Sequence, residues 1–99
     1  MIQMIQAALS ACNEIRDKYL GLPPMDHMEK GVVNGAFCCP VARTINAGRN
    51  GLDTVGVTPT VIVLGIVGDD RNAKIDTPEP IAGFIRAFDK GQFPELIET

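Results

Sequence analysis

Hydrophobic residues recur every three or four positions along the first twenty residues, and polar residues fill most positions between them. This spacing predicts a helix over residues 1–20 with one apolar face. Gly21, followed by Pro23 and Pro24, predicts where that helix ends. We expect the apolar face to pack on its own domain or on a second copy, because the run is too short for a stable coiled coil. The stripe consists of Met1, Ile5, Ala8, Cys12, Ile15 and Tyr19, widened by Ile2 and Leu9.

A shorter apolar pattern predicts a second helix over residues 40–47. Pro40 suits the first helical position, where its missing N–H group costs nothing, and this places Cys39 at the N-cap. Gly48 is typical of the residue that ends a helix. We expect a buried face of Val41, Ala42 and Ile45, and a solvent-facing side of Arg43, Thr44 and Asn46.

Three stretches with β-forming residues follow. Val55 and Val57 alternate with other residues over 53–58, which is typical of a strand with one buried face. Residues 60–67 are apolar on both faces and predict a central strand that is covered on each side. Turn residues over 68–72 and a return strand over 73–76 complete a hairpin. We also expect a turn at 49–51 and a short strand at 31–33, within an otherwise irregular segment from 21 to 37.

The last helix has the strongest apolar stripe of the chain. We expect Thr77 to cap it, Pro78 to take its first position and Gly91 to end it. The tail over 92–99 carries three apolar residues that can dock on the domain. The stripe consists of Ile81, Phe84, Ile85 and Phe88, and the tail adds Phe93, Leu96 and Ile97.

These elements predict an α+β fold, in which a small, mainly antiparallel sheet of three or four strands is flanked by three helices. Ninety-nine residues make a single domain, with the N-terminal amphipathic helix at 1–20 and an α+β core at 27–97. We expect the last helix to cover one face of the sheet. The first helix or another subunit must then cover the other face.

Several short motifs follow one another from residue 27 onward. They are His27-Met28-Glu29-Lys30-Gly31, Cys39-Pro40-Val41-Ala42, Val55-Gly56-Val57, Thr77-Pro78 and Phe84-Ile85-Arg86-Ala87-Phe88-Asp89-Lys90-Gly91. In this order they resemble a group of short uncharacterised proteins of actinobacteria and their phages. The chain departs from that group by its N-terminal helix and by lacking an acidic-aromatic ending after residue 94. The resemblance carries no assigned activity and implies a small cytosolic protein encoded by a phage.

Composition excludes several classes of function. A net charge of −3 argues against non-specific binding to nucleic acid, which needs a basic face. No apolar run approaches the ~18–20 residues that span a bilayer, and the start lacks the basic region of a signal peptide. The three cysteines suit a reduced, cytoplasmic protein better than a disulfide framework.

Basic residues gather around the second helix in this otherwise acidic chain. N–H groups at a helix N-terminus and its partial positive charge favour anions, and neighbouring cations would strengthen such a site. The alternative is that these charges are solvated and serve no ligand. The chain has no glycine-rich nucleotide motif. The predicted anion site consists of Cys39, Val41, Ala42, Arg43, Lys30 and Arg49.

The same helix start offers a second kind of chemistry. A thiol at the N-cap would have a lowered pKa, and His27 would be its base if the fold brought the two residues together. The alternative is that Cys38 and Cys39 are small buried hydrophobic residues. The spacing of the cysteines does not fit a zinc site, and we expect no metal and no cofactor. Asp69, Asp70 and Asp76 surround the hairpin, where we expect them to be exposed.

Together these patterns favour a non-enzymatic binding protein that works as a homo-oligomer. We expect it to occupy a host protein or to sequester a small, nucleotide-like anion. The alternative is a small enzyme or ligand site that uses a thiol or an anion pocket at the N-terminus of helix 40–47.

Overall fold

The computed structural model describes residues 2–35, 37–48, 54–65 and 73–97. Over these residues the chain forms three α-helices and a three-stranded antiparallel sheet of order β1-β2-β3, which confirms the predicted α+β class. The predicted turn at 49–51 and the hairpin loop at 68–72 lie outside the described residues. The elements are α1 (Ile2–Ile15), a π-helical extension (Arg16–Leu20), α2 (Pro40–Asn46), β1 (Thr54–Val57), β2 (Val61–Gly65), β3 (Ala73–Asp76), α3 (Glu79–Asp89) and a 3-10 turn (Pro94–Leu96).

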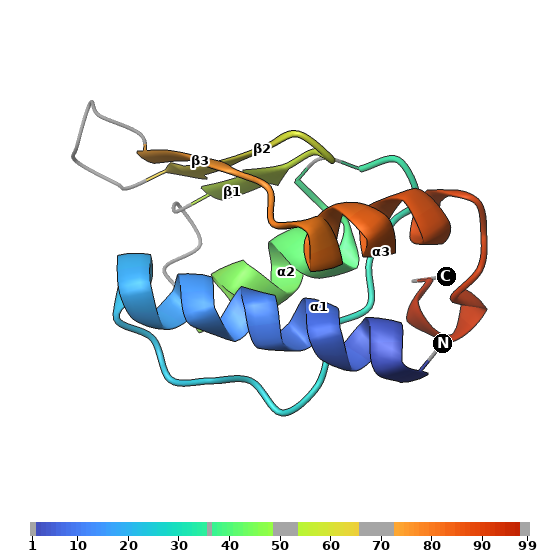
Figure 1. Ribbon diagram of the computed structural model, residues 1–99, viewed down its shortest axis with the longest axis horizontal. Coiled ribbons are helices and arrows are strands. Elements are labelled where there is room, and N and C mark those ends of the chain that lie inside the picture. The colour runs from blue at the N-terminus through green and yellow to red at the C-terminus, as the bar shows by residue number, and fades with distance from the viewer. Residues whose placement is uncertain (1, 36, 49–53, 66–72, 98–99) are drawn as a thin grey trace.

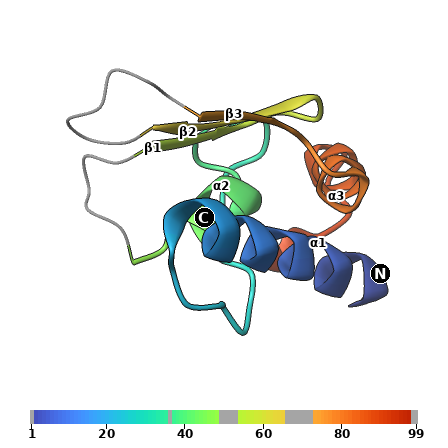
Figure 2. The ribbon, with the colours of Figure 1, turned by 60° about the vertical axis from the view of Figure 1, so that its left-hand side comes forward.

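All three α-helices lie on the same side of the sheet (Figure 1 and Figure 2). α2 packs against β1, and α1 packs against both α2 and α3. The expectation that α1 could cover the opposite face of the sheet is therefore wrong. On that outer face Phe37 lies over Gly56, where a Cβ atom would come within 3.1 Å of the phenylalanine ring.

The core fills the space between the sheet and the helices. β2 turns Ile62 and Leu64 into this core, whereas Val61 and Val63 on the outer face are only half-buried. β2 was predicted to be covered on both faces. Within this chain it is fully covered only on the face toward the helices. Three aromatic rings also belong to the core. Phe84 stacks on Phe88, with ring centroids 6.0 Å apart, and on Phe93, with ring centroids 4.9 Å apart.

Two local expectations are corrected by the structure. Thr77 does not cap α3, because its hydroxyl donates to the carbonyl of Thr58 at 2.8 Å, and Pro78 holds the N-cap position. Thr44 does not face solvent. It is fully buried, and its hydroxyl accepts a hydrogen bond from the backbone N–H of Glu29 at 2.9 Å.

The expected strand at 31–33 shrinks to a single parallel bridge between Gly31 and Ile97. The N–H of Gly31 donates to the carbonyl of Leu96 at 2.8 Å, which docks the tail. A Cβ atom at position 31 would lie 2.5 Å from the backbone of Cys38 and Cys39, so only glycine fits there.

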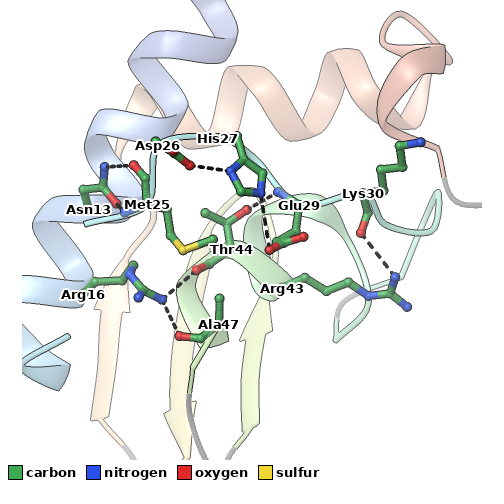
Figure 3. A network of polar contacts seen from close by, with 10 residues as sticks. All are labelled: Asn13, Arg16, Met25, Asp26, His27, Glu29, Lys30, Arg43, Thr44 and Ala47. Atoms are coloured by element: carbon green, nitrogen blue, oxygen red, sulfur yellow. Dashed lines mark hydrogen bonds and ion pairs between the residues drawn. The ribbon is translucent and has the colours of Figure 1, made fainter. Parts of the chain in front are cut away.

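Arg16 makes the contact that the periodicity of α1 did not reveal. Its side chain is 2% exposed and its guanidinium donates to the carbonyls of Thr44, Ile45 and Ala47 at 2.9, 3.1 and 2.7 Å. It also donates to the carbonyl of Pro23 at 2.9 Å. Of the carbonyls at the end of α2, that of Thr44 also accepts the N–H of Ala47 at 3.4 Å. The last carbonyls of a helix lie beyond its regular hydrogen bonds, and the negative end of the helix dipole favours a cation there. Arg16 therefore joins α1 to the end of α2 (Figure 3).

No helix within the described ranges has the length and apolar character needed to cross a membrane.

Phe88→Ala should destabilise the fold by about 3–5 kcal/mol, because it empties a site that is 1% exposed and removes one ring of the stack. In a domain of this size the melting temperature should fall by more than about 10 °C. Arg86→Ala on the exposed side of α3 is the matched control and should cost less than about 1 kcal/mol. Equal melting temperatures for the two variants would contradict this core.

Arg16→Met should cost about 2–4 kcal/mol, because the carbonyls at the end of α2 would lose charged donors while staying buried. Arg16→Lys should recover only part of this loss, since an ammonium cannot reproduce the fork of the guanidinium. Lys18→Met, at an exposed position of the same helical segment, is the control. Urea unfolding measures the stability of each variant and so checks the expected order of the three. An Arg16→Met protein as stable as the control would contradict the role of Arg16.

Candidate functional site

A groove of about 660 Å³ lies between the segment at 27–30, the C-terminal half of α2 and the docked tail. Its volume is within the range of small-molecule sites. Apolar and charged side chains both contribute, so the groove offers a ligand an apolar contact and several charges. The lining residues are His27, Met28, Glu29, Lys30, Arg43, Ala47, Gly48 and Leu96.

The segment that forms one wall of the groove is irregular but is tied down on both sides (Figure 3). The Asn13 side chain donates to the carbonyl of Met25 at 3.0 Å and accepts from its N–H at 2.8 Å. The N–H of Glu29 donates to the hydroxyl of Thr44. Met28 between these contacts is 5% exposed and belongs to the core. The wall is therefore held by side chains of α1 and α2 rather than by a helix or strand of its own.

His27 is the titratable group of the groove that changes charge near neutral pH. Its Nδ1 atom bonds the carboxylate of Asp26, and its Nε2 atom lies 3.6 Å from the carboxylate of Glu29. The hydrogen bond to Asp26 raises the pKa of His27 above its ordinary value of 6.5, and the negative charges of both carboxylates act in the same direction. The same contact lowers the pKa of Asp26. A positively charged imidazolium is therefore favoured at this edge of the groove.

The structure brings Lys30 and Arg43 of the predicted anion site together. The guanidinium of Arg43 donates to the backbone carbonyl of Lys30 at 3.2 Å, and both residues line the groove. In Figure 3 the ammonium of Lys30 points away from that contact, so the charged groups of the two side chains lie apart. Arg49, the third predicted cation, lies outside the described residues.

The backbone part of the predicted anion site lies elsewhere. Cys39, Val41 and Ala42 are all buried, with at most 4% of their surface exposed, and none of them lines the groove. The N–H of Ala42 donates to the sulfur of Cys39 at 3.4 Å, so the N-cap side chain occupies the position that an anion was expected to take. The start of α2 and its two cationic neighbours thus do not form one site.

The N-cap position predicted for Cys39 is confirmed, and of the two interpretations of its thiol the structure favours the small buried hydrophobic residue over the activated nucleophile. Burial raises the pKa of Cys39, and this outweighs the N–H groups of Ala42 and Val41, which act in the opposite direction. Burial also raises the pKa of Cys12 to about 12. Cys38 is exposed, contrary to the interpretation that the pair is buried. Burial of the sulfur therefore decides against a thiolate at the helix start.

Cys39 lines a second, smaller pocket of about 160 Å³ with Asn34, Thr58 and Asp89. The Asp89 carboxylate is engaged there, since it accepts a hydrogen bond from the N–H of Asn34 at 3.0 Å. His27 does not line this pocket, so the expected thiol–imidazole pair is not assembled. Within the described part of the chain, no three His, Cys, Asp or Glu side chains gather closely enough to hold a metal ion.

Sequence reasoning missed the polar residues that position the groove. Asn13 and Arg16 interrupt no apolar pattern, and Thr44 falls at a position next to the buried face of α2. One signal in the sequence pointed to Arg16: this long cationic side chain follows directly after Ile15, at the edge of the apolar stripe.

Comparison with known proteins finds nothing similar: no protein-family model, no curated protein and no solved structure matches this chain. The function must therefore be argued from the geometry of its own residues.

Native protein treated with iodoacetamide should be modified at Cys38 alone, because its sulfur is exposed whereas Cys12 and Cys39 are buried with raised pKa values. After unfolding in urea all three thiols should react at similar rates. Mass spectrometry of the digested protein assigns the sites. Rapid labelling of Cys39 in the native state would contradict the buried, protonated thiol.

Proposed function

We propose that this protein is a non-enzymatic binding protein whose groove holds a small molecule with a phosphate or similar anionic group. The observation that supports this most directly is that Lys30 and Arg43 line one groove that also contains Met28, Ala47 and Leu96. Cations bind the anionic group, and apolar side chains contact the rest of a ligand such as a nucleoside.

Charge along the groove favours an anion over a cation. Lys30 and Arg43 are positively charged at neutral pH, against the single carboxylate of Glu29 in the lining. The charge that His27 gains on protonation is offset by Asp26, whose carboxylate bonds its Nδ1 atom. This balance contrasts with the net charge of −3 of the whole chain.

A thiol-dependent enzyme has less support from the same geometry. It would need an ionised Cys39 and a nearby base, whereas that sulfur is buried with a raised pKa and its pocket does not include His27. Origin in a phage and action on a host protein are proposals that rest on the resemblance alone.

Thermal denaturation with a panel of adenine and guanine nucleotides tests the proposal. A ligand at ~100 times its dissociation constant should stabilise the protein by about 2.7 kcal/mol. Lys30→Glu and Arg43→Glu should each remove that stabilisation, since they place a negative charge on the groove. Lys90→Glu makes the same change of charge at an exposed residue outside the groove and should leave the stabilisation unchanged.

Binding should also weaken as pH rises through the raised pKa of His27, because the imidazolium then loses its charge. Cyclic AMP is a suitable probe, since its single charge does not change near neutral pH. His27→Ala should abolish this pH dependence while binding persists. If no nucleotide raises the melting temperature of the wild-type protein, the proposed anion site is wrong.

A further inference from the structure

The outer edge of β3 carries a pattern of charge and hydrogen-bonding groups that is complementary to itself. We propose that two copies of this chain pair through this edge as an antiparallel dimer, with Lys74 of each copy opposite Asp76 of the other. The proposal concerns a surface separate from the groove and does not depend on the proposed function.

The hydrogen-bonding pattern of the sheet shows which backbone groups of β3 point outward. Thr77 donates its N–H to the carbonyl of Thr60, so this pair is hydrogen-bonded, and in an antiparallel ladder the bonded pairs alternate. Ile75 opposite Ile62 is therefore the next bonded pair. Lys74 and Asp76 direct their N–H and C=O groups away from β2, and within the described residues no other backbone group bonds to them.

The side chains of the edge alternate in the same way. Ala73 and Ile75 are half-buried on the face toward the helices, whereas Lys74 and Asp76 are exposed on the outer face. No ion pair or side-chain hydrogen bond engages either charge within the described chain. The strand thus presents one cation and one anion, two residues apart, beside open hydrogen-bonding groups.

Only one register satisfies both the backbone and the charges. A two-fold axis at Ile75 places Lys74 opposite Asp76 of the second copy on both sides of the axis. Both pairs are hydrogen-bonded pairs, which exchange both of their N–H···O=C bonds, and each joins opposite charges directly across the ladder. The neighbouring registers that preserve the hydrogen bonds place Lys74 opposite Lys74 or Asp76 opposite Asp76, and like charges in that position are destabilising.

Charged residues on an edge strand often prevent pairing. Here the two opposite charges exclude the wrong registers and favour one. A second copy would also cover surface next to the edge. Tyr19 is 41% exposed and shares a recess of about 200 Å³ with Ile75 and Pro78, which the charged residues Glu14, Lys18 and Asp76 also line. Pro78 lacks an N–H group, so the ladder cannot extend beyond β3 in that direction. The contact is short, so the dimer should be a weak one, with a dissociation constant in the micromolar range.

Sedimentation equilibrium of the full chain from about 5 to about 500 µM is the test, because this range brackets a micromolar constant. The wild-type protein should pass from the 10.6 kDa of one chain to twice that mass. Asp76→Lys turns both cross-strand pairs into like-charge pairs and should raise the dissociation constant at least about tenfold. The double variant Lys74→Asp with Asp76→Lys exchanges the two charges and should restore the wild-type constant to within about threefold.

Amide exchange gives a second readout that a different dimer would not share. The amide protons of Lys74 and Asp76 should be protected at high protein concentration and exchange rapidly at low concentration. Both substituted positions are exposed, so circular dichroism should show an unchanged fold. A wild-type monomer across the whole range, a dimer insensitive to Asp76→Lys, or a double variant that fails to recover would each overturn the proposal. A dimer lost instead in Phe37→Ser would assign the interface to the outer face of the sheet and overturn it equally.

Discussion

The buried guanidinium of Arg16 is the contact on which the arrangement of the helices depends. A charged group that is 2% exposed is costly unless its donors are used, and here the carbonyls of Pro23, Thr44, Ile45 and Ala47 accept them. The same contact supplies donors to carbonyls at the end of α2, which lie beyond the regular hydrogen bonds of that helix. It uses no carboxylate. The cation is instead stabilised by the oriented dipoles of a helix end, and its hydrogen bonds join α1 to the end of α2.

The groove is a consequence of this arrangement. Its walls come from a segment without regular structure, from α2 and from the docked tail, and each is positioned by a polar contact to its neighbour. Asn13 holds Met25, Thr44 holds Glu29, and Leu96 receives the N–H of Gly31. Lys30 thus lies on a wall whose backbone is fixed without a helix or strand, whereas Arg43 comes from α2.

The sequence predicted most of the fold because its elements carry clear periodicity. The stripe Ile81 to Phe88, the alternation of Val55 and Val57, and the return strand 73–76 all appear where the pattern indicated. The failures occurred where a polar residue acts at long range. Thr44 was expected in solvent because threonine is polar, yet a buried backbone donor needs its hydroxyl. The position of Cys39 at a helix start left an activated thiol as an alternative to a buried one, and burial of its sulfur has the larger effect on its pKa. Lys30 and Arg43 line one groove, but no pattern reveals that this groove lies along the side of α2 and not at its start.

The bridge between Gly31 and Ile97 has a consequence for the order of folding. Both hairpins of the sheet join neighbouring segments and close short loops, whereas this bridge joins residues separated by most of the core. Contacts between distant positions form late, because the chain loses more entropy in bringing them together before any stabilising contact is made. We therefore expect the tail to dock after the sheet and helices have formed. Leu96 supplies one wall of the groove, so a partly folded chain would have a sheet and a core but an incomplete groove.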